Sequence, residues 1–375
     1  MLRLATIYLL FIFLFLSCKQ NRSVTNGRSQ NDSILIDDTS GIARLPILIE
    51  LKSEEVHLTE KVFGRTIDLI GTPLSFKEII KPQQLLVKNK YLITKNDRKD
   101  SVFMIFELPD LKCVSAFGVM GRGPDEFVYP PQLVETEEDS ILFYIYEINT
   151  EKIYKVNLKS LKPEYYLTLP KHNKSFDSKQ IFFTNNKNAI YVSNTSKSKM
   201  IYTFNKDSLQ QGKELLDLAI PGIKGSWTTY IGDFGVNMYY GRIAYAYKYF
   251  KRIRILDINS MTERHIVFDA EELTEGQNDI ATLEPTNVTH FWGMSPKKEA
   301  FWMLYSGRTP VDVQRDNRNN NKFIFVEKYD WNGNLLKRYR LDDWGYFCVD
   351  NQDKTIYLAS TASVYSMLKY NIPDN

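Results

Sequence analysis

The sequence predicts an all-β protein folded as a six-bladed β-propeller with four-stranded antiparallel blades. Apolar runs of about four to eight residues alternate with polar turns, and no helical stripe extends beyond two or three turns. The 23 Tyr and 22 Phe residues favour strands. One hairpin pattern recurs with polar anchor residues at Glu107, Asn157, Asn205 and Asp257, which are 50, 48 and 52 residues apart. Such a period in an all-β chain is typical of propeller blades.

Two further copies of the hairpin bring the count to six. Asp330 anchors the fifth copy, and its distance of 73 residues from Asp257 reflects an insertion at 306–322. We expect this insertion to be a solvated, mobile loop rather than an anion site, despite its arginines. A partial sixth copy is anchored at Asn371, near the end of the chain. Because this copy lacks a strand, we expect an N-terminal strand at 62–70 to complete the last blade and close the ring.

The anchors are expected to cap their hairpins, because Asn and Asp side chains readily bond to the backbone of a turn. The fifth hairpin also contains Asn332-Gly333, which is a strong short-range hairpin signal. Asp330, Asn332 and Asn334 have the spacing that begins a calcium loop, but no glutamate follows at the twelfth position. We therefore predict a structural turn and no bound metal.

The N-terminus predicts export and a lipid anchor. Residues 1–17 have the pattern of a signal peptide that is too short to span a bilayer. Cys18 ends a segment that resembles a bacterial lipobox, so we predict that its acylated thiol holds the protein on the membrane. The alternative is an ordinary cleaved signal with an incidental cysteine. We expect a flexible tether at 18–55 and the propeller at 56–375.

A glycine-rich corner, FGVMGRGPDEF at 117–127, follows the first hairpin. It resembles the FG-x-x-G-x-GP-x-EF signature of the TolB-like six-bladed β-propeller lipoproteins of Gram-negative bacteria. Segments 70–74 and 85–94 are similar to the opening of the same family, and the resemblance extends from about residue 62 onward. It implies the same propeller fold and a binding or scaffold role in the cell envelope. The absence of acidic residues directly after Cys18 favours the periplasmic side of the outer membrane.

The corner provides one candidate ligand site, formed by Arg122, Asp125 and Glu126. Three glycines within six residues permit positive φ angles and a close approach of the backbone. The alternative is that the glycines form a tight crossover between blades and that Arg122 pairs with a neighbouring carboxylate. No Lys-Ser or Lys-Thr follows the glycines, so the corner is not a phosphate loop.

A second candidate site lies in the aromatic and glycine-rich stretch 225–235. Such a stretch between blade units can line the central opening of a propeller, where Trp227 and Tyr230 would stack on a sugar or a peptide. The alternative is that both side chains pack between blades. Trp292 lies in a more strand-like context, and we expect it in the core.

Composition and motifs exclude several classes of function. The net charge of +3 gives no electrostatic case for nucleic acid. The four histidines lack the spacing of a metal pair, and no G-x-S-x-G motif occurs, so we assign no catalytic residue and no cofactor. Cys113 and Cys348 both lie in apolar runs, and their pairing stays open, as does the oligomeric state.

Three functions remain as hypotheses. The first is a lipid-anchored envelope propeller that binds a protein or glycan ligand through its loops. The second is a hydrolase or lyase for a polysaccharide or lactone, which would require carboxylates, or His with Asp, converging on the central channel. The third is a structural subunit of an envelope complex, which would require an exposed apolar patch.

Overall fold

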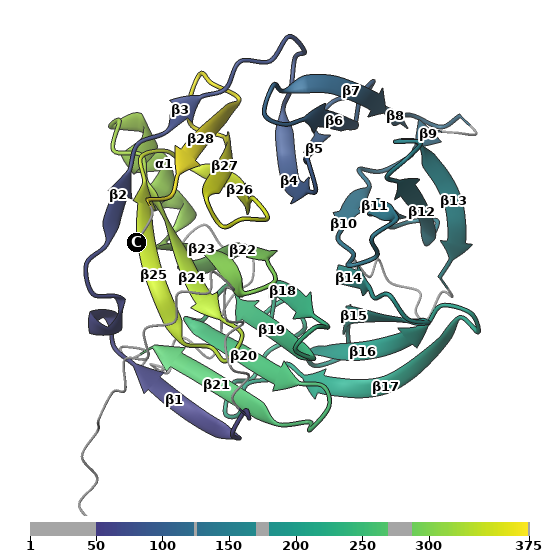
Figure 1. Cartoon of the computed structure of the whole chain (residues 1–375). Coiled ribbons are helices and arrows are strands. Elements are labelled where there is room, and N and C mark those ends of the chain that lie inside the picture. Colours follow the sequence, from purple (N-terminus) through teal and green to yellow (C-terminus); the bar gives the residue numbers. More distant parts are fainter. Residues whose placement is uncertain (1–49, 124–125, 170–179, 269–286, 374–375) are drawn as a thin grey trace, which may run out of the picture. The chain divides into compact units, whose positions relative to one another are not determined.

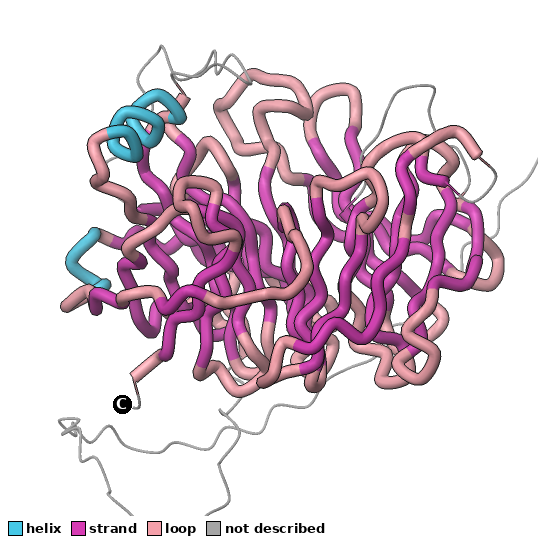
Figure 2. Tube along the Cα trace, turned by 90° about the horizontal axis from the view of Figure 1, so that it is seen from above, coloured by secondary structure: helices cyan, strands magenta, loops and turns pink. Residues whose placement is uncertain are grey.

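The computed structural model describes residues 50–123, 126–169, 180–268 and 287–373. The predicted signal peptide, Cys18 and most of the predicted tether lie outside these residues. Six sheets surround a central channel (Figure 1), and their strands run roughly along the axis of the ring (Figure 2). The prediction of a six-bladed propeller is therefore confirmed. Within the described ranges, no helix has the length and apolar character needed to cross a membrane.

Each blade is a meander in which the first strand faces the channel and the fourth lies at the rim. The blades comprise, in chain order, β4 (Pro82–Lys88), β5 (Tyr91–Asn96), β6 (Phe103–Glu107) and β7 (Lys112–Phe117); β10 (Gln132–Val134), β11 (Ile141–Glu147), β12 (Lys152–Asn157) and β13 (Pro163–Thr168); β14 (Gln180–Phe183), β15 (Asn188–Asn194), β16 (Lys199–Asn205) and β17 (Gln210–Asp217); β18 (Gly232–Asn237), β19 (Arg242–Tyr247), β20 (Arg252–Asp257) and β21 (Glu263–Phe268); β22 (Thr289–Pro296), β23 (Ala300–Arg308), β24 (Ile324–Asp330) and β25 (Leu335–Leu341); and β26 (Gly345–Val349), β27 (Thr355–Ser360) and β28 (Met367–Asn371) with β3 (Thr72–Pro73).

The six predicted anchor residues occupy one position in the ring, the last residue of the third strand of each blade. The expected capping is also present: the Asn205 side chain accepts hydrogen bonds from the backbone N–H groups of Asp207 and Ser208 at 3.0 and 2.9 Å. Four residues after each of the first four anchors, the chain adopts a positive φ between 53° and 57°, at Leu111, Leu161, Leu209 and Met261. The copied unit is therefore a turn with a fixed backbone shape as well as a pattern of side chains.

Neighbouring blades pack through their apolar faces. Along β23, Phe301 and Met303 lie in a cluster with residues of β19 and β20, in the preceding blade. Trp302 and Leu304 point the other way and pack against β27, in the following blade. This alternation is the two-residue period of a strand. Because both faces of a blade are covered, its central strands are apolar throughout, as in β11, where all seven residues are buried.

An N-terminal strap, residues 54–73, runs along the outer edges of the last three blades (Figure 1). Its first strand, β1 (Glu54–Leu58), pairs in parallel with β21. Its second strand, β2 (Ile67–Leu69), pairs in parallel with β25 of the fifth blade. Only then does β3 pair with β28 and supply the missing strand of the last blade. An N-terminal strand does close the ring, but the prediction that 62–70 forms it was wrong, since the closing residues are Thr72 and Pro73.

The strap is fixed by contacts on both sides of the short closing strand. Asp342 Oδ1 accepts hydrogen bonds from the Gly71 N–H at 3.1 Å and from the Tyr370 hydroxyl at 3.0 Å. A Cβ atom at residue 71 would lie 2.8 Å from the Tyr370 ring, which explains the glycine. Beyond β3, the Leu74 N–H donates to the Met367 carbonyl at 3.0 Å.

Phe63 anchors the middle of the strap between two blades. It ends a short 3-10 helix, η1 (Glu60–Phe63), and only 6% of it is exposed. Its ring stacks on Phe268 with a centroid distance of 5.6 Å and lies 3.3 Å below the guanidinium carbon of Arg338. Arg338 is in turn held by the fully buried Glu327 at 2.9 Å. The aromatic face and the buried ion pair thus stabilise each other.

The insertion in the fifth blade is ordered, so the prediction of a mobile loop was wrong. It extends β23 to Arg308 and then forms α1 (Pro310–Arg318), which Figure 2 shows at one end of the ring. The Thr309 hydroxyl accepts from the Asp312 N–H at 3.1 Å, and Pro310 occupies the first helical turn. This is a capping box, which is readable in the sequence TPVD. We call the end of the ring that carries α1 the upper face.

Cys113 and Cys348 are both free thiols in the structure. Cys113 is half-buried and Cys348 is buried, and burial raises the pKa of Cys348 to about 12. A thiol with so high a pKa is unreactive at neutral pH.

We predict that Phe63→Ala destabilises the propeller by about 3 kcal/mol, because it removes a buried ring and uncovers a charged group. The measurement is urea unfolding followed by tryptophan fluorescence. Val62→Ala is the matched control, since Val62 is adjacent and 45% exposed, and we expect it to cost less than about 0.5 kcal/mol. An equal effect of both substitutions would show that the strap is not fixed at Phe63.

Candidate functional site

The candidate site is the channel mouth, a cavity of about 420 Å³ at the upper end of the central channel. Its lining comes from the innermost strands of all six blades and the residues next to them, and these strands surround the axis of the ring (Figure 1). Its polar and aromatic lining includes Gln84 of β4, Glu135 after β10, Gln180 of β14, Asp233 of β18, Lys248 after β19, Trp292 of β22 and Tyr346 of β26.

Glutamine side chains join neighbouring inner strands. Gln84 Oε1 accepts from the Leu133 N–H of the next blade at 3.0 Å. Gln180 Nε2 donates to the Gly232 carbonyl of the next blade at 2.8 Å. These bonds satisfy backbone groups that an open channel would otherwise leave to solvent. The inner strands are therefore held in fixed positions before any ligand arrives.

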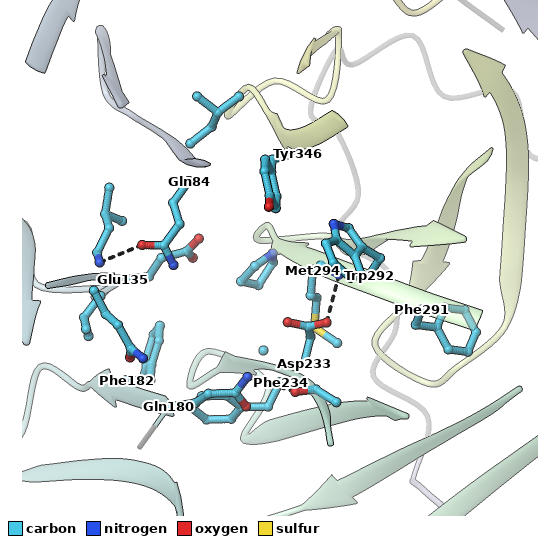
Figure 3. Close-up of a pocket in the computed structure, with 18 of the residues that line it drawn as sticks. Gln84, Glu135, Gln180, Phe182, Asp233, Phe234, Phe291, Trp292, Met294 and Tyr346 are labelled. Carbon is cyan, nitrogen blue, oxygen red and sulfur yellow. Dashed lines mark hydrogen bonds between the residues drawn. The ribbon is translucent and has the colours of Figure 1, made fainter. Parts of the chain in front are cut away.

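Two carboxylates enter the cavity, Glu135 and Asp233 (Figure 3). Burial raises the pKa of Glu135, and Lys297 and Lys88 oppose that shift. Burial also raises the pKa of Asp233, although Asp233 Oδ2 accepts from the Gly293 N–H at 2.8 Å. The positive charges near Glu135 and Asp233 are thus too few to offset the cost of removing these carboxylates from water. They present hydrogen-bond acceptors to anything that enters the channel.

An aromatic wall faces these carboxylates. Trp292 and Tyr346 lie with their ring centroids 6.0 Å apart and point toward the cavity (Figure 3). Lys248 Nζ lies 4.5 Å from the centre of the Trp292 ring, and burial lowers the pKa of Lys248 while the charge of Asp233 raises it. Trp292 packs against the core and lines the cavity, so it is more than the core residue that the sequence predicts.

The predicted corner site lies on the upper face, between the outer strand of the first blade and the inner strand of the second. Glu126 Oε2 accepts from the Gly123 N–H at 2.7 Å, so this carboxylate holds the turn together. A Cβ at Gly121 would lie 2.0 Å from the same oxygen, which accounts for that glycine. Arg122 is exposed, and Asp125 lies outside the described residues. Neither Arg122 nor Glu126 lines the channel mouth, and a ligand role of the corner stays a prediction.

The predicted stretch 225–235 does reach the channel, but through its last five residues, 231–235. Tyr230 is 2% exposed, and its hydroxyl donates to the Ile223 carbonyl at 2.8 Å. Trp227 is 37% exposed, and Lys199 Nζ lies 5.4 Å from its ring centre. Asp233 is the charged residue of this stretch in the cavity lining, and neither Trp227 nor Tyr230 lines it. A ligand role of Trp227 and Tyr230 stays a prediction.

One sequence signal pointed to the channel residues. Gln84, Gln132 and Gln180 are each 48 residues apart, close to the spacing of the hairpin anchors, and all three line the cavity. Glu135 and Asp233 carry no such signal, because their approach depends on how six inner strands converge. Among the described residues, no group of three or more His, Cys, Asp or Glu side chains has the geometry to hold a metal ion.

Comparisons with known proteins agree with this architecture. Residues 71–352 match the family described as TolB-like 6-blade propeller-like. A DUF4221 family member from Bacteroides vulgatus is 12% identical, with a TM-score of 0.53, covering 81% of this chain and 95% of its own. A Bacteroides fragilis protein named for its proposed export is also 12% identical, with a TM-score of 0.54, covering 86% of this chain and 99% of its own. These two likenesses concern the fold alone. Among curated proteins, no sequence matches the chain.

We predict that Glu135→Gln makes the protein more stable than the wild type at pH 7. A raised pKa means that the folded state binds more protons than the unfolded state above the ordinary value of 4.5. The protonated Glu135 carboxyl therefore contributes its full stabilisation of the folded state below pH 4.5, and this contribution is lost as the pH rises through the raised pKa. Glutamine resembles the neutral carboxyl and does not ionise, so the variant does not lose this stabilisation at pH 7.

Urea unfolding at pH 4 and pH 7 measures the difference between variant and wild type. The control is Asp139→Asn, since Asp139 is exposed on the same loop, and we expect no change there. A difference for Glu135→Gln that is the same at both pH values would show that this carboxyl carries no unfavourable burial.

Proposed function

Since the chain belongs to the TolB-like six-bladed propeller family, we propose that it is a cell-envelope binding protein that takes its ligand at the channel mouth. The observation that carries the proposal is the pairing of two poorly neutralised carboxylates with an aromatic wall in one rigid cavity. Carboxylates demand hydrogen-bond donors, and an aromatic face attracts a cation or a flat group. The ligand that fits is a protein segment with an ammonium or amide group that enters the channel. A glycan is the alternative that the same experiment tests.

Three features support a tethered protein of the cell envelope. The N-terminal sequence has a signal peptide pattern and the lipobox-like Cys18, whose acylation would anchor the protein in the outer membrane, facing the periplasm. A structural neighbour is named for its proposed export. Strand β1 runs parallel to β21, which rises from the lower to the upper face, so the chain enters the propeller at the end opposite the channel mouth. This entry suits a protein that is held by its N-terminus and binds ligand from solution.

A hydrolase or lyase acting on a polysaccharide or lactone is the second candidate, favoured by the raised pKa values of Glu135 and Asp233. A raised pKa brings a carboxyl closer to the range in which a general acid works at neutral pH. In that case Glu135→Gln and Asp233→Asn would each lower turnover by at least about a hundredfold. Turnover of polysaccharide or lactone substrates by the wild type is the observation that would favour this candidate over simple binding.

The experiment for the binding function is a peptide and glycan array probed with the full mature chain. We expect enrichment of peptides with free amino groups, and we expect Tyr346→Ala to weaken that binding about tenfold by removing half of the aromatic wall. Tyr165→Ala is the matched control, since Tyr165 is 58% exposed on the outer strand β13. Enrichment that survives Tyr346→Ala, or no enrichment on either array, would contradict binding at the channel mouth.

A further inference from the structure

A second cavity, of about 450 Å³, lies beside α1 on the upper face. Its walls come from the top of β23, from α1 and from the segment that enters the sixth blade. The residues that could contact a ligand include Trp292, Ser306, Arg308, Asn317 and Trp344. We call it the α1 cavity. It lies outside the channel, and Trp292 forms part of the wall of both cavities.

The α1 cavity arises where an apolar strand face turns polar. Alternate residues of β23 point toward the sixth blade, and Trp302 and Leu304 fill the core there. The next two residues on the same face are Ser306 and Arg308. The inserted residues extend the strand above the core, so this polar continuation meets α1 and Trp344 instead of apolar side chains. The chemistry of the cavity is therefore set by the insertion.

Three residues that line the α1 cavity each carry a buried polar atom with no hydrogen-bond partner among the described residues: Ser306 Oγ, Arg308 Nε and Asn317 Oδ1. Ser306 is only 3% exposed. Arg308 is otherwise fixed, since Nη1 pairs with Asp316 at 2.8 Å, Nη2 donates to the Phe323 carbonyl, and the Phe323 ring lies 3.7 Å from Cζ. Unpaired buried polar atoms are costly, and three of them belong to residues around one cavity, which points to a ligand that pairs with them.

The charge of the α1 cavity selects an anion. Arg308 and Arg318 line it, and no Asp or Glu is among the described residues of its lining. Asp316 takes one end of the Arg308 guanidinium and leaves Nε available as a donor. Arginine N–H groups are well matched to carboxylate oxygens.

The remaining groups narrow the class of anion. Asn317 Oδ1 is an acceptor and needs a donor on the ligand, whereas Ser306 Oγ can donate or accept. A ligand hydroxyl satisfies both, and Trp292 and Trp344 offer ring faces to a compact ring. We infer that the α1 cavity binds a hydroxylated ring carboxylate, the class of the hexuronic acids. The α1 cavity would therefore bind an anion, whereas the channel mouth is proposed to bind a ligand with an ammonium or amide group.

The test is isothermal titration of the full mature chain with three probes. Glucuronate carries both the carboxylate and the hydroxyls, glucose carries only the hydroxyls, and benzoate carries only the carboxylate and a ring. We expect glucuronate to bind at least tenfold more tightly than either of the others. Equal affinity for benzoate would overturn the class of ligand, and no binding of glucuronate would overturn the site.

Variants locate the binding. Asn317→Leu is expected to weaken glucuronate binding at least tenfold, whereas Asn321→Leu, an exposed asparagine of the same insertion outside the cavity, is expected to leave it unchanged. Ser306→Ala is expected to weaken binding about fivefold without lowering the melting temperature, because it removes an unpaired group. Unchanged binding in both cavity variants would overturn the assignment.

Glu135→Gln separates this inference from the proposed function. We expect full glucuronate affinity in that variant, because Glu135 lies in the channel mouth and not in the α1 cavity. Loss of glucuronate binding there would place the acid in the channel mouth and overturn the α1 cavity as its site.

Discussion

The closing contact of the ring is the constraint on which the rest of the propeller depends. Only two residue pairs join β3 to β28, and a strand that short contributes few hydrogen bonds, each worth about 1 kcal/mol. The strap compensates for these few hydrogen bonds because it contacts three blades and not only the last one. Its pairing with β21, the burial of Phe63 and the hydrogen bond from Gly71 to Asp342 fix it before it reaches the last blade. The ring is thus closed by contacts along the whole strap, and not by β3 alone.

A closed ring explains how the channel mouth can hold groups that oppose folding. Glu135 and Asp233 lose hydration there without gaining a full ion pair, and burial raises the pKa of each carboxyl. Such a cost is tolerable only where the surrounding structure is fixed by other contacts. The glutamine bonds between inner strands and the apolar packing of the blades supply that rigidity. Buried carboxyl groups that lower stability and make no compensating structural contact are expected at a binding site.

How far the sequence predicts this protein depends on the range of each contact. The hairpin anchors were predictable, because a turn is fixed by a few consecutive residues such as Asn205 to Leu209. The closing residues were not, since Gly71 and Asp342 are 271 positions apart and nothing local distinguishes 67–69 from 72–73. The capping box of α1 was readable at Thr309 but was missed, because the asparagines and arginines around it suggested a solvated loop. Among the cavity residues, Gln84, Gln132 and Gln180 share a 48-residue spacing, whereas Glu135 and Asp233 depend on the convergence of distant blades, which no local pattern reveals.

The two cavities differ in how they belong to the fold. The channel mouth is built from the repeated inner strands, so every blade contributes to it. The α1 cavity depends on one insertion that breaks the sixfold repeat, as expected where loops vary on a constant scaffold. Trp292 belongs to both walls, and the Lys248 ammonium lies over its ring. The two cavities therefore share a wall, and linkage requires that any coupling of ligand affinities through it be equal in both directions.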